Sequence, residues 1–123
     1  MKQYYKKIHL SSDGSKIENI THRIKDIVFK SEIKNGIVNV SILNTTASLI
    51  IQENADPDVL RDLQTFYRKL VPMNGDYVHS SEGVDDMPAH IKSTLTNSNL
   101  TLSVLEGVIP VSYTHLRAHE TRE

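Results

Sequence analysis

The chain of 123 residues contains no cysteine and no tryptophan, and only 6% of its residues are aromatic. The absence of cysteine excludes disulfide bonds, thiolate metal sites and cysteine nucleophiles within the chain. It agrees with a reducing compartment, so we expect a cytoplasmic protein. No apolar run approaches the ~20 residues that a membrane-spanning helix needs. The polar start of the chain (Met-Lys-Gln-Tyr-Tyr-Lys-Lys) leads into no apolar stretch, which argues against a signal peptide.

The charge of the chain is almost balanced, with 14 lysine and arginine residues against 15 aspartate and glutamate residues. The basic residues are scattered and are not interleaved with aromatic ones, so we expect no nucleic-acid partner. The length is sufficient for one domain with one core.

Two helices are predicted in the first 70 residues. In the first, isoleucine recurs at positions 17, 20, 24 and 27, which forms one helical stripe and places Thr21 on the opposite face. The second covers residues 57–70, with Asp56 as its N-cap and Pro57 in its first turn. Its leucine and aromatic residues predict an amphipathic helix.

A third helix follows a loop over residues 73–86. Asp85 and Asp86 are more typical of helix caps than of catalytic groups, and Asp86 can cap this helix. Ile91 and Leu95 would then form its buried face.

The remaining segments predict strands over residues 4–10, 37–43, 48–52 and 100–105, and Glu106-Gly107 turns the chain toward one more strand. This order of elements does not form regular βαβ units. We therefore expect an α+β fold with a mainly antiparallel sheet.

The last residues read as foreign sequence. Residues 111–121 (VSYTHLRAHET) match one reading frame of a transposase-type sequencing adapter. We therefore expect a single domain over residues 1–109 and a non-native tail over residues 110–123. On this interpretation His115 and His119 are not metal ligands, despite their i, i+4 spacing. The alternative is a natural tail of mixed polarity.

Candidate functional side chains lie at the ends of apolar segments between residues 44 and 92. His79 and His90 have the chemistry to bind a divalent metal or to transfer protons, although a solvated or capping histidine is more common at such spacing. Glu53 ends an apolar strand, where a carboxylate can act as a metal ligand or general base, or simply face water.

Two further features suit phosphate oxygens. The turn Asn44-Thr45-Thr46 offers hydroxyl and backbone N–H groups to a phosphate. The alternative is that its side chains only close a local Asx turn. Lys92 offers a positive charge, or it is a solvated helix residue.

Five motifs in this block resemble the YjbQ-like family of secondary thiamine-phosphate synthases, which are small trimeric domains. The motifs read Asn-Thr-Thr-Ala (44–47), Glu-Asn-Ala-Asp-Pro (53–57), Arg-Asp-Leu (61–63), Tyr-Val-His (77–79) and Asp-Asp-Met-Pro-Ala-His-Ile-Lys (85–92). Many family members carry histidine at the position of Asn44, whose amide cannot titrate. They also continue into a Gly-Thr-Trp-Gln strand, and the chain has no tryptophan.

The resemblance implies a β-sandwich-like core with helices outside, a homotrimer and a small phosphorylated substrate. It implies synthesis of thiamine phosphate from a pyrimidine diphosphate and a thiazole phosphate. A metal-dependent phosphate-ester hydrolase, a non-catalytic metabolite-binding trimer and an inactive truncated chain are the alternatives.

The same resemblance assigns roles to individual residues. The expected catalytic residues are Glu53, His79 and His90. The expected ligands of a divalent ion, zinc or magnesium, are His79, His90 and Asp62. The expected substrate contacts are Asn44, Thr45, Thr46 and Lys92.

Overall fold

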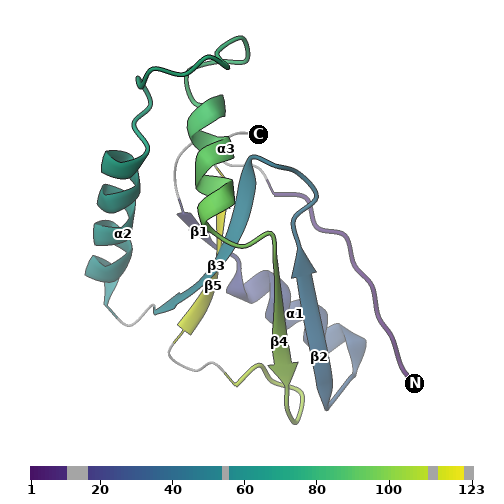
Figure 1. Cartoon of the computed structure of the whole chain (residues 1–123). Helices are drawn as coiled ribbons and strands as arrows, with labels where there is room; N and C mark the ends of the chain where they lie inside the picture. Colours follow the sequence, from purple (N-terminus) through teal and green to yellow (C-terminus); the bar gives the residue numbers. More distant parts are fainter. Residues whose placement is uncertain (11–16, 54–55, 111–113, 121–123) are drawn as a thin grey trace.

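The computed structural model describes residues 1–10, 17–53, 56–110 and 114–120 (Figure 1). In chain order the elements are β1 (Ile17–Asn19), α1 (Thr21–Ser31), β2 (Gly36–Ser41), β3 (Ala47–Glu53), α2 (Pro57–Leu70), α3 (Asp86–Leu95), β4 (Asn99–Val104) and β5 (Thr114–Glu120). The helices and strands are mixed along the chain without βαβ repeats. The expected α+β class is therefore confirmed.

The described strands form two small sheets in which every pairing is antiparallel. One sheet has the order β1-β5-β3, and the other pairs β2 with β4 from Gly36↔Val104 to Ser41↔Asn99. Leu49 on β3 and Asn97 before β4 exchange two backbone hydrogen bonds of 2.7 and 3.1 Å. These bonds connect the two sheets at the point where α3 ends. The central strand β5 comes from the expected tail, and the division of the chain at residue 109 stays a prediction.

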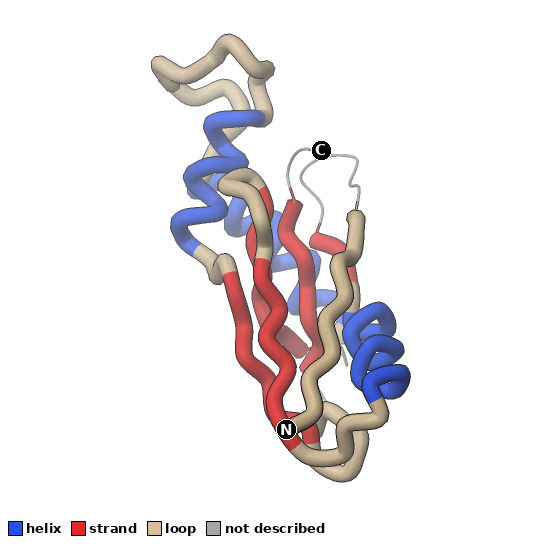
Figure 2. The backbone as a smooth tube through the Cα atoms, turned by 90° about the vertical axis from the view of Figure 1, so that its right-hand side faces the viewer, coloured by secondary structure: helices blue, strands red, loops and turns tan. Residues whose placement is uncertain are grey.

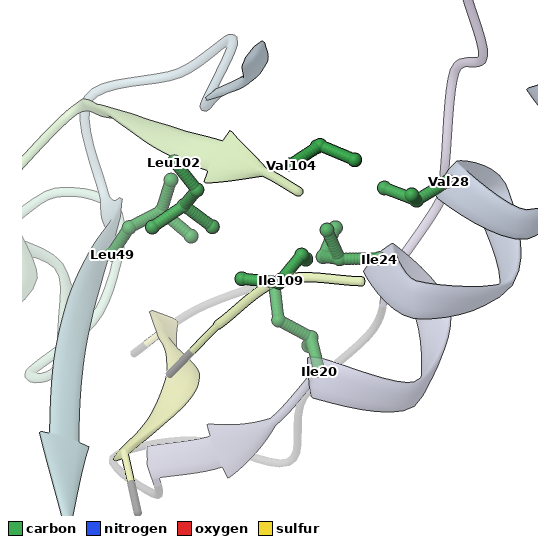
Figure 3. Close-up of a cluster of buried hydrophobic side chains, with 7 residues drawn as sticks. All are labelled: Ile20, Ile24, Val28, Leu49, Leu102, Val104 and Ile109. Atoms are coloured by element: carbon green, nitrogen blue, oxygen red, sulfur yellow. The ribbon is translucent and has the colours of Figure 1, made fainter. Parts of the chain in front are cut away.

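The hydrophobic core lies between α1 and the two sheets (Figure 3). Its buried members are Ile20, Ile24, Val28, Leu49, Leu102, Val104 and Ile109. The first three follow the i, i+4 spacing of one helical face, so the predicted stripe exists but is shifted. Ile17 belongs instead to β1. Thr21, expected on the outer face, is buried at 3% exposure, and its hydroxyl donates a 2.6 Å hydrogen bond to Asn19 Oδ1.

The first ten residues do not form the strand expected over 4–10. They run extended beside β2 (Figures 1 and 2). Ile8 and Leu10 still pack against the core. The alternation of polar and apolar residues therefore predicted correctly that one side of the segment is buried. Burial alone does not pair the backbone of the segment with a neighbouring strand.

Helix α2 begins as predicted, because the Asp56 side chain accepts a 2.9 Å hydrogen bond from the backbone N–H of Asp58 and Pro57 occupies the first turn. Although the helix is amphipathic, none of its residues is buried. Phe66 and Leu70 remain 56% and 53% exposed. No helix in the described part of the chain has both the length and the apolar character needed to cross a membrane.

Helix α3 differs from its prediction in two ways. Its N-cap is Asp85, so Asp86 already belongs to the first turn of the helix. Leu95 is 52% exposed, whereas Pro88, Ala89 and Lys92 are buried. The helix contacts β3. Compared with the prediction it is rotated about its own axis, so that Lys92 rather than Leu95 lies on the buried face.

Candidate metal centre

The first turns of α3 and the preceding loop bring together one carboxylate and two imidazoles. Asp86 Oδ2 lies 2.5 Å from His79 Nε2 and 3.4 Å from His90 Nε2. The Asp86 side chain is 1% exposed, while those of His79 and His90 are 41% and 34% exposed. The two imidazole rings meet edge to face, with centroids 5.5 Å apart. A buried acid therefore supports two imidazoles that remain accessible to solvent.

Local geometry explains why these three side chains meet. Asp86 and His90 are separated by four residues on α3, so they project from the same face of the helix. His79 comes from the long loop between α2 and α3, which lies at the end of both helices (Figure 1). The loop turns at Gly83, whose φ of 109° suits glycine and whose N–H donates to Ser80 O. This turn brings His79 back to the start of α3.

The loop also forms an open hollow of about 670 Å³ beside His79. Residues 76–81 and Met87 line it. Tyr77 is held in this wall because its hydroxyl donates a 2.6 Å hydrogen bond to Pro72 O. A volume of this size is within the ~300–1,000 Å³ typical of sites for small molecules.

The donor set fits a transition metal better than magnesium. The three candidate ligand atoms all lie within 4.8 Å of one another. With metal–ligand bonds of about 2.0–2.1 Å, two ligands of a tetrahedral zinc ion are separated by about 3.3 Å. The distance between Asp86 and His90 already fits. The distance between Asp86 Oδ2 and His79 Nε2 is 2.5 Å, so it would have to widen by about 0.8 Å for both atoms to hold one zinc ion.

Two of the expected ligands, His79 and His90, lie together in this cluster, and their binding of a metal stays a prediction. Asp62 is exposed on α2 and does not belong to the cluster. Asp86 takes its place. The sequence carries a signal for this acid, because Asp86 stands four residues before His90, but an acid at the start of a helix is more typical of a cap. The side chain of Glu53 lies outside what the structure describes.

The turn at residues 44–46 forms the local Asx turn that was the alternative to a phosphate site. Asn44 Oδ1 accepts a 3.0 Å hydrogen bond from the backbone N–H of Thr46, which closes an Asx turn. Asn44 and Thr45 are exposed. Their contact with a substrate stays a prediction.

Lys92 is not the solvated residue that one interpretation favoured. Its side chain is buried on α3, with a relative exposure of 3%. Burial is the main cause that lowers the pKa of Lys92, and the nearby positive charge of Arg68 lowers it further.

Comparison with known proteins agrees with this fold. Residues 6–113 match the family described as UPF0047 protein YjbQ-like. A UPF0047 protein of Synechocystis is 44% identical over 107 residues, which cover 86% of this chain and 73% of that protein. The YjbQ protein of Escherichia coli is 36% identical over 107 residues, covering 86% of this chain and 78% of its own. The chain belongs to the UPF0047 family.

A solved structure of the same family, an uncharacterized conserved protein of Clostridium acetobutylicum, matches with a TM-score of 0.81 and 32% identity. The match covers 94% of this chain and 88% of that one. A YbjQ-like protein of unknown function from Sulfolobus solfataricus matches with a TM-score of 0.76 at 23% identity, covering 88% and 78% of the two chains. At that identity it supports the fold alone.

These comparisons confirm the family resemblance and correct the expected activity. The UPF0047 relatives carry only the name of a family of unknown function, and the solved structures are described as uncharacterized or of unknown function. None of these relatives is named a thiamine-phosphate synthase. The expectation that this chain joins a pyrimidine diphosphate to a thiazole phosphate is therefore wrong.

Proposed function

We propose that the chain is a metal-dependent enzyme that activates water, with His79, Asp86 and His90 as the residues that hold the metal. The supporting observation is the buried Asp86 carboxylate within reach of two partly exposed imidazoles. Two nitrogen donors and one oxygen donor favour zinc over magnesium, because magnesium prefers oxygen ligands. A zinc ion held by three residues would supply Lewis acidity and activate water at neutral pH.

The protein side chains would have separate tasks. Asp86 is removed from solvent, and its Oδ2 atom faces the Nε2 atoms of both imidazoles, so these three atoms could converge on one ion. His79 borders the hollow through which a small substrate would approach. The hollow is open to solvent, so we infer a soluble small molecule as the substrate rather than a polymer enclosed in a tunnel.

A second mechanism has its own support. The 2.5 Å contact between Asp86 and His79 is short enough for a charge-assisted hydrogen bond. A buried carboxylate that orients an exposed imidazole is an arrangement suited to general base catalysis without a metal. In that case His79 would accept a proton from water, and His90 would have no direct role in the reaction.

One experiment separates these mechanisms. The chain is stripped with a chelator, reloaded with zinc or cobalt(II), and assayed against a panel of activated carboxylic esters. We expect activity and the cobalt absorption bands to depend on the metal and to be lost in His90→Ala. They should persist in His22→Ala, which removes an exposed histidine of α1.

The outcomes are distinct for each mechanism. Activity that survives chelation and His90→Ala but not His79→Ala identifies the metal-free pair. Absence of metal-dependent turnover in a chain that retains the cobalt bands refutes the proposed reaction. Absence of the bands refutes the metal centre itself.

We also propose that the chain assembles into a homotrimer, with the exposed apolar side of α2 in the contact. The support is that Phe66 and Leu70 are more than half exposed on an amphipathic helix that buries none of its residues. Sedimentation should give a trimer for the parent chain and smaller species for Phe66→Lys. A monomeric parent at about 100 µM, well above a micromolar dissociation constant, contradicts this assembly.

A further inference from the structure

The hollow beside His79 has a lining whose charge bears on the ligand that fits it. Among the lining residues, 76–81 and Met87, the one carboxylate is that of Asp76, and none is a lysine or an arginine. Asp76 is exposed, and its side chain makes no hydrogen bond or ion pair within the described part of the chain. An unpaired carboxylate at such a hollow attracts a cation and repels a phosphate or a carboxylate.

The wall next to Asp76 is aromatic and is held in place. The Tyr77 hydroxyl donates a 2.6 Å hydrogen bond to Pro72 O, and the Tyr77 backbone N–H donates a 3.0 Å hydrogen bond to Gly75 O. Gly75 also lies against the phenol, because a Cβ added there would lie 2.8 Å from Tyr77 Cζ. The ring is therefore fixed within an open loop. The face of an aromatic ring attracts a nearby cation.

The other lining residues supply hydroxyl groups and apolar surface. Ser80 and Ser81 are exposed, and their hydroxyl oxygens can accept hydrogen bonds from an N–H group. Val78 is fully exposed and Met87 is half-buried, so both offer apolar contact to a ligand. A small molecule with a positively charged nitrogen and a short apolar body would use all of these groups.

We propose that this hollow binds small organic ammonium ions and that the substrate of the metal centre carries such a group. Asp76 would accept a hydrogen bond from the ammonium, and the ring of Tyr77 would stabilise its charge. This substrate class rests on the function proposed above, because it takes the hollow beside His79 as the path of the substrate. It differs in charge from the phosphorylated substrate that the family resemblance implies. Binding of the ammonium needs no metal, so the two can be tested apart.

The binding test compares benzylamine, benzyl alcohol and benzoate, which are similar in size and are a cation, a neutral molecule and an anion at neutral pH. The full chain is used in the presence of a chelator, and binding is followed through the NMR signals of residues 76–81. We expect saturable binding of benzylamine, weaker binding of benzyl alcohol and none of benzoate. Asp76→Asn should weaken benzylamine binding about fivefold, the effect of one exposed charge pair, and leave that of benzyl alcohol unchanged.

Asp62→Asn controls for a general change in charge, because Asp62 is an exposed acid of α2 outside the hollow. It should bind benzylamine as the parent does. Tyr77→Leu should weaken benzylamine binding more than benzyl alcohol binding, because only the cation loses the attraction of the ring face. The proposal is overturned if the parent binds the three probes alike or binds none of them, or if Asp76→Asn binds benzylamine as tightly as the parent.

Turnover separates failure of this substrate class from failure of the proposed function. The zinc-loaded chain is assayed with dimethylaminoethyl acetate, a cation at neutral pH, and with isopentyl acetate, its uncharged isostere. A lower KM for the cationic ester that is lost in Asp76→Asn supports the substrate class. Metal-dependent turnover with equal KM for both esters refutes the substrate class and keeps the reaction. Binding of benzylamine without metal-dependent turnover of either ester supports the ammonium site and refutes the reaction.

Discussion

Replacing Asp86 by asparagine is the most direct perturbation of the candidate metal centre. The substitution keeps the size of the side chain but removes the anionic oxygen that lies 2.5 Å from His79 and 3.4 Å from His90. Loss of a residue that merely orients a ligand weakens metal binding about 10–100-fold. Asp86 would be a ligand, so we expect zinc affinity to fall at least about a hundredfold.

This loss can be expressed as a change in thermal stability. Zinc at a hundred times its dissociation constant stabilises a folded chain by about 2.7 kcal/mol. A domain of this length gains about 4 °C in Tm per kcal/mol, so the parent should gain about 10 °C. With a hundredfold weaker site, the same zinc concentration stabilises Asp86→Asn by about 0.4 kcal/mol, a gain of about 2 °C.

Differential scanning fluorimetry measures both shifts, with each variant compared with its own chelated form. This comparison removes any effect that the substitution has on the fold. Asp62→Asn is the matched control, because Asp62 is the acid that the family resemblance predicted as a metal ligand and its side chain is exposed. It should behave as the parent. Equal zinc shifts in the parent and Asp86→Asn would refute the assignment of Asp86 as a ligand.

Two further predictions concern stability. Leu49 is fully buried, so Leu49→Ala should lower the free energy of unfolding, measured with urea, by about 2–5 kcal/mol. Leu43 is 75% exposed, so Leu43→Ala should lower it by less than about 0.5 kcal/mol. Equal losses in the two variants would contradict the described core. The lowered pKa of Lys92 means that the unfolded chain holds this proton more tightly, so the stability of the parent rises as pH passes from the folded pKa to the ordinary value of about 10.4. Lys92→Met should therefore be more stable than the parent at pH 7, with an advantage that shrinks as the pH rises toward about 10.4. An advantage independent of pH would contradict this reasoning.

The sequence predicted those elements whose signals are local. Helix α2 starts where Asp56 and Pro57 indicated, because a cap and a fixed proline φ act within one turn. The strands β2, β3 and β4 lie within a few residues of their predicted limits. The segment 4–10 failed because strand pairing requires a partner elsewhere in the chain, and periodicity carries no information about that partner.

The site was predicted in part, for a related reason. His79 and His90 were predicted as ligands because both stand on motifs of the family resemblance, whereas their spacing alone favours solvated or capping histidines. Asp86 was assigned to capping because acids near a helix start are common there, and the choice between a cap and a ligand depends on a shift of one residue. The burial of Asp86, at 1% exposure, favours a place inside the cluster over that of a solvated cap.

The rotation of α3 shows how the packing of one helix positions the candidate metal centre. The apolar residues Ile91 and Leu95 predicted which face would be buried, yet the helix turns Ala89 and Lys92 inward and leaves Leu95 half exposed. This orientation gives up apolar burial at Leu95 and encloses a charge at Lys92, both of which are unfavourable for folding. The same orientation places Asp86 and His90 together beside the loop that carries His79. A helix that departs from its best packing at a candidate site is the pattern expected where function, rather than stability, constrains the residues.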